Sequence, residues 1–201
     1  MPKQPLLILA TRNSHKTEEI RHILGDRFEV LDVTSFPELP EIDETGTTFL
    51  ENARLKALGI SRRIDGWVLA DDSGLEVDAL GGTPGVWSSS YGGEEGNHAK
   101  NNARLMREMA GITDRSARFR CTLVLAKYGE EKAVFTGTVE GRISESPSGN
   151  GGFGYDPLFI PEGHSQTMAD LGAAVKSTLS HRAEAIRAFV AAVEKGKLVN
   201  L

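Results

Sequence analysis

The chain has little cysteine and no long apolar run. Cys121 is the one cysteine among 201 residues, so no internal disulfide can form, which is typical of the reducing cytoplasm. The apolar runs are much shorter than the ~20 residues that cross a bilayer. No basic and apolar leader precedes Leu6, so no secretory signal is expected. We therefore expect a cytoplasmic protein that does not bind a membrane.

Excess positive charge is also missing. Lysine and arginine number 23 against 28 aspartates and glutamates, which gives a net charge of -5. This balance argues against a nucleic-acid binder, and any site for a polyanion must be a local basic pocket. The sequence has no internal repeat, low-complexity tract or proline-rich linker. Residues 1–201 are therefore expected to form a single domain, large enough to bury a core.

Apolar periodicity predicts helices that alternate with strands early in the chain and a hairpin later. Thr48 and Glu51 form a capping-box pattern at the start of a helix, and Gly25 is expected to end an earlier one. The expected class is α/β, with a mixed central sheet and flanking helices. Strands are expected at 6–10, 67–70, 119–126, 133–139 and 158–160, and helices after 15, after 47, over 98–110 and from 180.

Two adjacent acids, Asp71 and Asp72, follow the apolar run Trp67–Ala70 and precede Ser73 and Gly74. This pattern predicts a buried strand that ends in charge at the sheet edge where α/β folds bind ligands. Paired carboxylates suit Mg²⁺, which takes oxygen ligands and shares them with substrate phosphates. A plain surface turn is the alternative, but the preceding strand favours a site.

The segment from Thr11 to Lys16 connects the first expected strand to the first expected helix. Backbone N–H groups at such a turn attract an anion, and Lys16 adds a full charge. The glycine spacing of a Walker loop is missing, and an ordinary helix cap is the alternative. On the next expected helix, Lys56 shares a face with Asn52. The Lys56 side chain either contributes to an anion site or extends to solvent.

Two further motifs indicate a ligand. The loop 151–157 combines glycines with Phe153, Tyr155 and Asp156, which suits close approach, stacking and hydrogen bonding, although a structural turn is the alternative. Lys176, His181 and Arg182 lie at the expected start of the last helix, where the helix dipole disfavours cations unless an anion joins them. Cys121 lies within a strand pattern, and we interpret it as a packing residue.

Together, these motifs resemble one family, the inosine/xanthosine triphosphate pyrophosphatases. The resemblance implies an elongated α/β fold with two lobes around an active-site cleft, and a homodimer. It implies Mg²⁺-dependent hydrolysis of ITP, dITP and XTP to the monophosphate and pyrophosphate, which cleanses the nucleotide pool. The matching motifs, in order along almost the whole chain, are Thr11-x-Asn13-x-x-Lys16, 48–57, Asp71–Leu75, Leu80–Gly85, Gly151–Pro157 and Ser180–Arg182.

The resemblance also implies roles for single residues. Asp72 matches the general base and metal ligand, and Lys56 a catalytic lysine near the phosphates. The further acidic metal ligand is Asp43 or Glu44, between which the sequence does not choose. The implied substrate-binding residues are Thr11, Arg12, Asn13, Ser14, His15 and Lys16 for the triphosphate, Ser73, then Phe153, Gly154, Tyr155 and Asp156 for the base, and Lys176, His181 and Arg182 for the 6-oxo group and phosphates.

In the implied mechanism, an activated water attacks the α-phosphorus and pyrophosphate leaves. A donor such as Arg182 or His181 would distinguish a 6-oxo purine from adenine. The chain departs from the family pattern at Ser90, where arginine is usual, and at Ala174, where an acid is common. Two alternatives remain, a pyrophosphatase for modified pyrimidine nucleotides and a catalytically silent nucleotide-binding protein.

Overall fold

Three long strands organise the computed structural model, which describes residues 4–196. They are β3 (Trp67–Val77), β4 (Ser116–Lys127) and β5 (Glu130–Ile143), and each passes through both of two compact units. Within the described range, unit 1 comprises 4–72, 121–137 and 182–196, and unit 2 comprises 73–120 and 138–181. Because the units interleave along the chain, no single cut separates them.

Unit 1 begins with a parallel arrangement. Strand β1 (Leu6–Leu9) pairs in parallel with β2 (Glu29–Asp32) on one side and with β3 on the other, so Leu7 lies opposite both Val30 and Trp67. The strand order across this unit is β2-β1-β3-β4-β5. The helices of the unit are α1 (Ser14–Leu24), α2 (Phe49–Ser61) and α5 (His181–Glu194).

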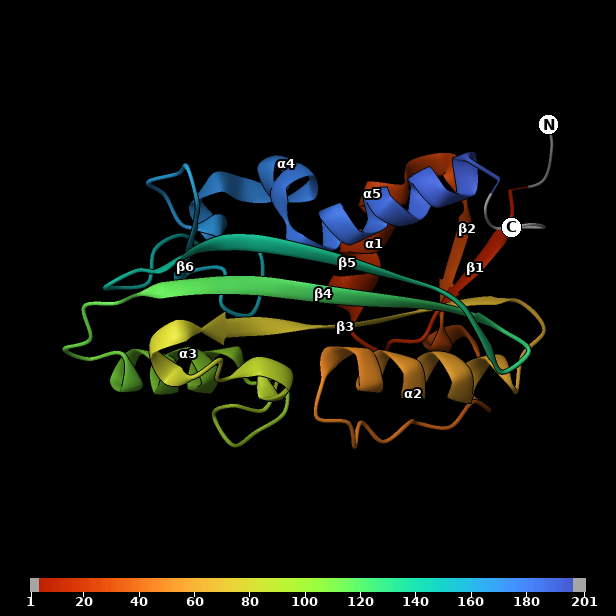
Figure 1. The fold of residues 1–201 in the computed structure, drawn as a ribbon, viewed down its shortest axis with the longest axis horizontal. Helices are drawn as coiled ribbons and strands as arrows, with labels where there is room; N and C mark the ends of the chain where they lie inside the picture. The colour runs from red at the N-terminus through yellow and green to blue at the C-terminus, as the bar shows by residue number, and fades with distance from the viewer. Residues whose placement is uncertain (1–3, 197–201) are drawn as a thin grey trace. The chain divides into compact units, whose positions relative to one another are not determined.

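Alternating side chains give the strands of unit 1 two apolar faces. Leu7 and Leu9 of β1 join a core cluster with Ile20 of α1 and Phe189 of α5. Ile8 and its neighbour Ala10 join a second cluster with Ala53 and Ala57 of α2. Figure 1 shows α1 and α5 on one side of these strands and α2 on the other. Residues of β3 follow the same rule, so odd and even positions meet different helices.

Unit 2 contains the remaining parts of β3, β4 and β5. Strand β6 (Phe159–Pro161) pairs antiparallel with β5, and Phe159 lies opposite Ile143. The helices are α3 (His98–Glu108) and α4 (Met168–Leu179), and they contribute Leu105 and Met168 to one apolar core. The sheet is therefore mixed, with order β2-β1-β3-β4-β5-β6 overall.

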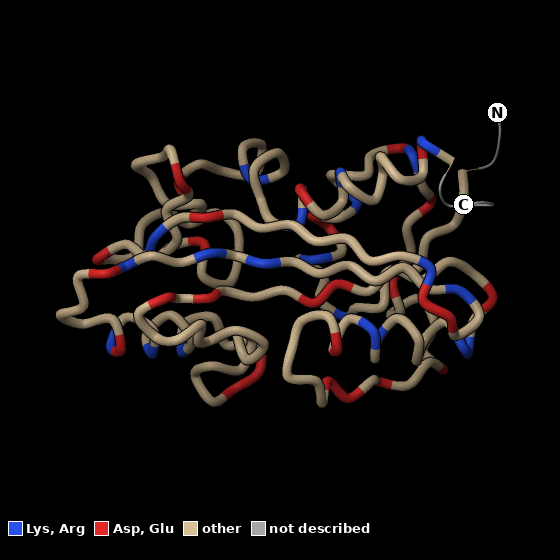
Figure 2. The backbone as a smooth tube through the Cα atoms, in the orientation of Figure 1, with Lys and Arg blue, Asp and Glu red and all other residues tan. Residues whose placement is uncertain are grey.

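The cations of β4 in unit 2 are engaged by acids of the adjacent strands. Arg118 bonds Asp78 at 2.7 Å and Glu140 at 2.9 Å, and Arg120 bonds Glu76 at 2.6 Å. Figure 2 shows blue segments on β4 between red segments of its neighbours. These arginines form a cross-strand ion-pair network, so their charge is not available as a polyanion patch.

Many local predictions are confirmed. The expected α/β class, with a mixed sheet and flanking helices, is the observed one. Thr48 and Glu51 form the capping box of α2, and Gly25 ends α1 with a backbone φ of 57°. The expected hairpin is also observed, but β4 and β5 are longer than predicted, and only Tyr128 and Gly129, both with positive φ, connect them.

Other predictions of elements were wrong. Strand β2 and helix α4 were not expected, and β6 begins one residue later than predicted. Strand β3 does not end at Ala70 but continues to Val77. No helix among residues 4–196 is both long and apolar enough to cross a membrane. The two lobes with a cleft, and the single domain, stay predictions.

Candidate active site

Asp71 and Asp72 lie in the middle of β3, not at its end. The expectation of a strand that terminates in charge is therefore wrong, because Ser73 to Val77 continue the same strand. Successive strand residues point to opposite faces. Asp71 consequently shares the face of Trp67 and Leu69, which pack with α1 and α5, and Asp72 shares the face of Val68 and Ala70, which pack with α2.

Asp71 is the anion of a buried charge network. Its Oδ2 accepts from Arg182 Nε at 2.9 Å and from the Cys121 thiol at 3.1 Å, and its Oδ1 lies 2.5 Å from Lys16 Nζ. Burial alone would raise the pKa of Asp71, but Arg182 and Lys16 outweigh it and hold this pKa well below its usual range. Asp71 is therefore ionised and fully engaged, which suits charge balance rather than proton transfer.

Arg182 is buried as part of the same network. Its side chain is 1% exposed, and its Nη1 donates to Glu19 at 2.9 Å in addition to the Asp71 contact. Sequence reasoning did not find Glu19, although it follows Lys16 by three residues and so lies on the same side of α1. The prediction that Arg182 reads the purine stays untested, and the contacts favour a role in placing Asp71.

The Cys121 thiol is enclosed in the same core. It is 1% exposed and belongs to the apolar cluster of Leu123 and Leu125. Burial, followed by the nearby Asp71 carboxylate, raises its pKa well above the ordinary value. The interpretation of Cys121 as a packing residue rather than a nucleophile is confirmed.

Asp72 lies beside two other charged groups on the α2 face. Its Oδ1 is 3.3 Å from Lys56 Nζ, and the same ammonium lies 2.8 Å from Glu44 Oε2. Burial raises the pKa of Asp72 to about 6, while Lys56 and Lys16 oppose the rise and Glu44 adds to it. A carboxylate with this pKa is mostly ionised at neutral pH yet more basic than an ordinary aspartate, which suits a general base.

Lys56 does not extend to solvent. Its side chain is 11% exposed, which removes the alternative that it snorkels outward. Burial lowers the pKa of Lys56, but Asp72 and Glu44 outweigh that effect, so the pKa is raised and the amine stays protonated. Asn52, one helical turn earlier, accepts from Gly46 N at 2.7 Å and so holds the segment that carries Glu44.

The acids in this cluster fit a hard divalent cation. Asp43 and Glu44 are both exposed, but it is Glu44 that the structure brings to the Lys56–Asp72 pair. Asp72 Oδ2 is buried and accepts no hydrogen bond from the described residues. Within residues 4–196, no group of three or more His, Cys, Asp or Glu side chains is spaced to hold a metal. Two carboxylates suffice for Mg²⁺ when substrate phosphates complete its coordination.

The segment before α1 is shaped by its own side chains. Thr11 Oγ1 accepts from Asn13 N at 3.1 Å, and Asn13 caps α1 by accepting from Lys16 N at 3.3 Å. Arg12 donates to Leu39 O at 2.9 Å, which anchors the loop. The helix-cap interpretation is therefore correct, and it leaves the positive end of α1 facing outward, because residues 12–15, including Ser14 and His15, are exposed.

Unit 2 gathers a second group of predicted residues around Asp156. Its Oδ2 accepts from Phe153 N at 2.8 Å and from Lys176 Nζ at 2.5 Å. Lys176 Nζ also lies 4.1 Å from the centre of the Phe153 ring. Gly152 has a φ of 72°, and a Cβ there would lie 2.0 Å from Asp156 Oδ2. Asp156 thus fastens the glycine loop to α4.

The rings of this group have different surroundings. Phe153 is half-buried, whereas Tyr155 is buried and donates to Ser88 O at 2.9 Å. His181 is buried and stacks on Phe119, with ring centres 4.9 Å apart. Gly154 O accepts from Asn102 at 3.1 Å, and Ser73 is partly buried on β3. Phe153 is therefore the more exposed of the two rings of this loop.

The prediction that three cations lie at the start of the last helix is only partly correct. Lys176 lies in the last turn of α4, where a cation interacts favourably with the helix dipole. His181 and Arg182 do begin α5, but Asp71 and Glu19 neutralise Arg182. These cations therefore have protein partners, and the dipole argument for an anionic ligand does not hold for Lys176.

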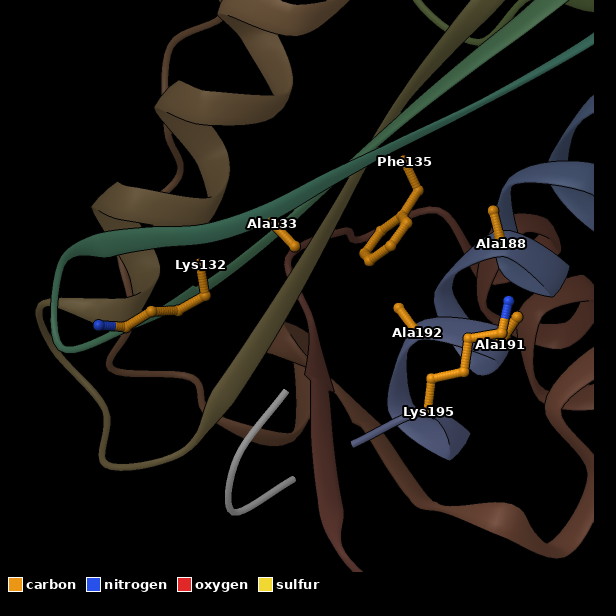
Figure 3. A pocket seen from close by; sticks show the side chains of 7 residues that line it. All are labelled: Lys132, Ala133, Phe135, Ala188, Ala191, Ala192 and Lys195. Carbon is orange, nitrogen blue, oxygen red and sulfur yellow. The ribbon is translucent and has the colours of Figure 1, made fainter. Parts of the chain in front are cut away.

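A cavity in unit 1 contains none of the predicted site residues. It has a volume of about 520 Å³ and lies between β5 and α5 (Figure 3). Its lining consists of Lys132, Ala133, Phe135, Ala188, Ala191, Ala192 and Lys195. The lining has no carboxylate or hydroxyl, in contrast to the Asp72 cluster.

Comparisons with known proteins identify the family of the chain. A model described as the Ham1 family matches residues 7–192. A dITP/XTP pyrophosphatase of Streptococcus pyogenes serotype M1 is 49% identical over 186 residues, covering 90% of this chain and 57% of the relative. The chain thus spans little more than half of that relative's length. A dITP/XTP pyrophosphatase of Bacillus licheniformis is 46% identical over 192 residues, covering 94% of this chain and 98% of the relative.

A solved structure supports the fold. The Ham1 protein of Staphylococcus aureus matches with a TM-score of 0.84 and 37% identity, covering 94% of this chain and 98% of that one. The observed mixed α/β arrangement is therefore shared with a relative of nearly equal length.

Proposed function

This chain belongs to the Ham1 family, and from that premise we propose that it hydrolyses ITP, dITP and XTP to the monophosphate and pyrophosphate. The observation that carries the proposal is Asp72. It is a buried carboxylate with a pKa raised to about 6 by burial, an Oδ2 without a protein donor, and an adjacent ammonium from Lys56. A base, a cation and a lone pair that no protein donor occupies are what attack on phosphorus requires.

The residues of unit 1 are assigned to the triphosphate. Asp72 takes the proton of the attacking water, and Lys56 offsets the charge that develops on the leaving pyrophosphate. Lys16 and the outward N–H groups at the start of α1 bind phosphate oxygens. A divalent cation, for which we propose Mg²⁺, supplies further charge stabilisation and acidifies the water, and Glu44 and Asp72 would hold it. Most of the catalysis is positioning and electrostatics.

The residues of unit 2 are assigned to the base. Phe153 stacks on the purine, and Lys176, held by Asp156, offers N–H donors near that ring. A donor that meets the 6-oxo group rejects adenine, which carries an amine there. The proposal also includes a homodimer in the cytoplasm, where the nucleotide pool is found.

A substrate panel tests the proposal. The protein is incubated with Mg²⁺ and ITP, dITP, XTP, GTP, dATP or dTTP, and pyrophosphate and free phosphate are measured separately. Pyrophosphate confined to the inosine and xanthosine nucleotides is the expected result. Equal turnover of every nucleotide would overturn the assignment of base recognition, and phosphate as the first product would overturn attack at the α-phosphorus.

A further inference from the structure

One ammonium group lies where two predicted metal-binding carboxylates meet. Lys56 Nζ contacts Glu44 Oε2 at 2.8 Å and Asp72 Oδ1 at 3.3 Å. The side chains of Lys56 and Asp72 are 11% and 9% exposed, so water screens the contact between these two groups poorly. Lys16 pairs with Asp71 on the other face of β3, so it is not the ammonium that joins Glu44 and Asp72.

Lys56 holds one oxygen, Glu44 Oε2 and Asp72 Oδ1, of each of the two carboxylates that a cation would use. A carboxylate oxygen that faces an ammonium at hydrogen-bond distance cannot simultaneously bind a divalent ion without bringing two positive centres close together. We propose that Lys56 is an internal counter-ion of Glu44 and Asp72 that excludes a divalent cation from them, and that must leave them when the cation binds. This inference rests on the proposed function for the identity of the metal-binding acids.

Because Lys56 excludes the cation from Glu44 and Asp72, binding of the cation changes the position of the Lys56 ammonium, which also binds phosphate. Lys56 has three N–H donors, and two carboxylates take part of that capacity. Once Lys56 has left Glu44 and Asp72, its whole charge faces the polyphosphate. The loss of this charge should therefore change turnover and metal affinity in opposite directions, whereas a lysine that merely supports the fold would lower both.

Metal affinity of Lys56 variants tests the inference. Isothermal titration with Mg²⁺ alone compares the wild type with Lys56→Met, which removes the charge, and with Lys56→Arg, which keeps it. We expect Lys56→Met to bind Mg²⁺ at least about tenfold more tightly, and Lys56→Arg to stay close to the wild type. Lys132→Met is the matched control, because Lys132 lies on β5 and pairs with Glu130.

A measurement on the unmutated protein keeps the test independent of folding. Acetylation of lysines, followed by peptide mapping, is compared with and without saturating Mg²⁺. Labelling of Lys56 is expected to rise with Mg²⁺, while labelling of Lys132 stays constant. Unchanged or slower labelling of Lys56, equal or weaker Mg²⁺ binding by a folded Lys56→Met protein, or no Mg²⁺ binding by any form would each overturn the inference. Tighter binding in a protein that hydrolyses no nucleotide would overturn only the proposed function.

Discussion

At the scale of single residues, the informative contrast is between two neighbouring acids. Asp71 is ionised and paired with Arg182 and Lys16, while Asp72 has a raised pKa and an oxygen without a donor. The two environments differ because adjacent strand residues face opposite sides of the sheet. Two identical side chains thus acquire different charge states and different partners.

Replacement of the base tests this division. Asp72→Asn keeps the shape of the side chain but cannot accept a proton, so we expect pyrophosphate release from ITP to fall by about 10²–10⁴-fold. Nucleotide binding, measured by equilibrium dialysis, should persist. Asp78→Asn, an exposed acid beyond the end of β3, serves as the control and should leave turnover unchanged. Near-normal turnover in Asp72→Asn would refute its role as base.

A buried acid outside this cluster, Asp32, predicts sensitivity of the fold to acid. Burial raises the pKa of Asp32, but hydrogen bonds from Thr34 and Thr17 outweigh it, so the folded-state pKa is lowered. Asp32 therefore contributes stability above its unfolded pKa of about 3.8, and that contribution is lost as the pH falls through the lower folded value.

Urea denaturation measures this contribution. Asp32→Asn should be less stable than the wild type at pH 7, and the difference should shrink as the pH falls below 4. Asp26→Asn, which changes an exposed acid in the same region, is the control and should stay close to the wild type at pH 7. A constant gap between wild type and Asp32→Asn across this range would contradict the assignment.

At the scale of elements, a capping box stabilises the first turn of α2, the helix that carries Lys56. Thr48 Oγ1 accepts from Glu51 N at 3.2 Å, and Glu51 accepts in return from Thr48 N at 3.1 Å. Thr48→Ala should lower the free energy of unfolding by about 1 kcal/mol, because one helix N–H group loses its partner. Thermal unfolding checks the value, with Thr113→Ala, an exposed position, as a reference expected to change little.

The glycine loop of unit 2 allows a similarly matched pair. Gly152→Ala places a Cβ 2.0 Å from Asp156 Oδ2 and should disturb its contact with Lys176. Gly163 has a φ of 78° with open space around it, so Gly163→Ala carries the backbone strain without the clash. We expect the KM for ITP to rise in Gly152→Ala and to stay nearly constant in Gly163→Ala. Equal KM values would argue against a role for this loop in base binding.

At the scale of the whole chain, residues far apart in sequence complete the core of unit 1. Arg182 reaches Asp71 across a separation of 111 residues and fixes the start of α5 to β3. Asp71→Asn would leave this buried guanidinium without its main counter-charge, and we expect a loss of about 3–5 kcal/mol. Urea denaturation of Asp71→Asn and of Asp26→Asn compares a buried with an exposed acid, and similar midpoints would contradict the buried network.

Much of this architecture was predictable from local patterns. The apolar runs of β1 and β4, the Thr48 cap and the Tyr128–Gly129 hairpin depend on neighbours within a few residues, so their signals are in the sequence itself. Helix α4 was missed because it is interrupted at Gly172, whose φ of 78° is not helical, and this break hides its periodicity.

The sequence by itself determined the α/β class, the family and the residue types that the chemistry needs. Only the tertiary structure decided the surroundings of each acid. It extended β3 through Asp71 and Asp72, directed them to opposite faces, brought Glu44 rather than Asp43 to Lys56, and enclosed Arg182 with Asp71 and Glu19. The physical reason is that propensity and capping act within a few residues, whereas burial and charge pairing depend on distances that exist only after the chain has folded.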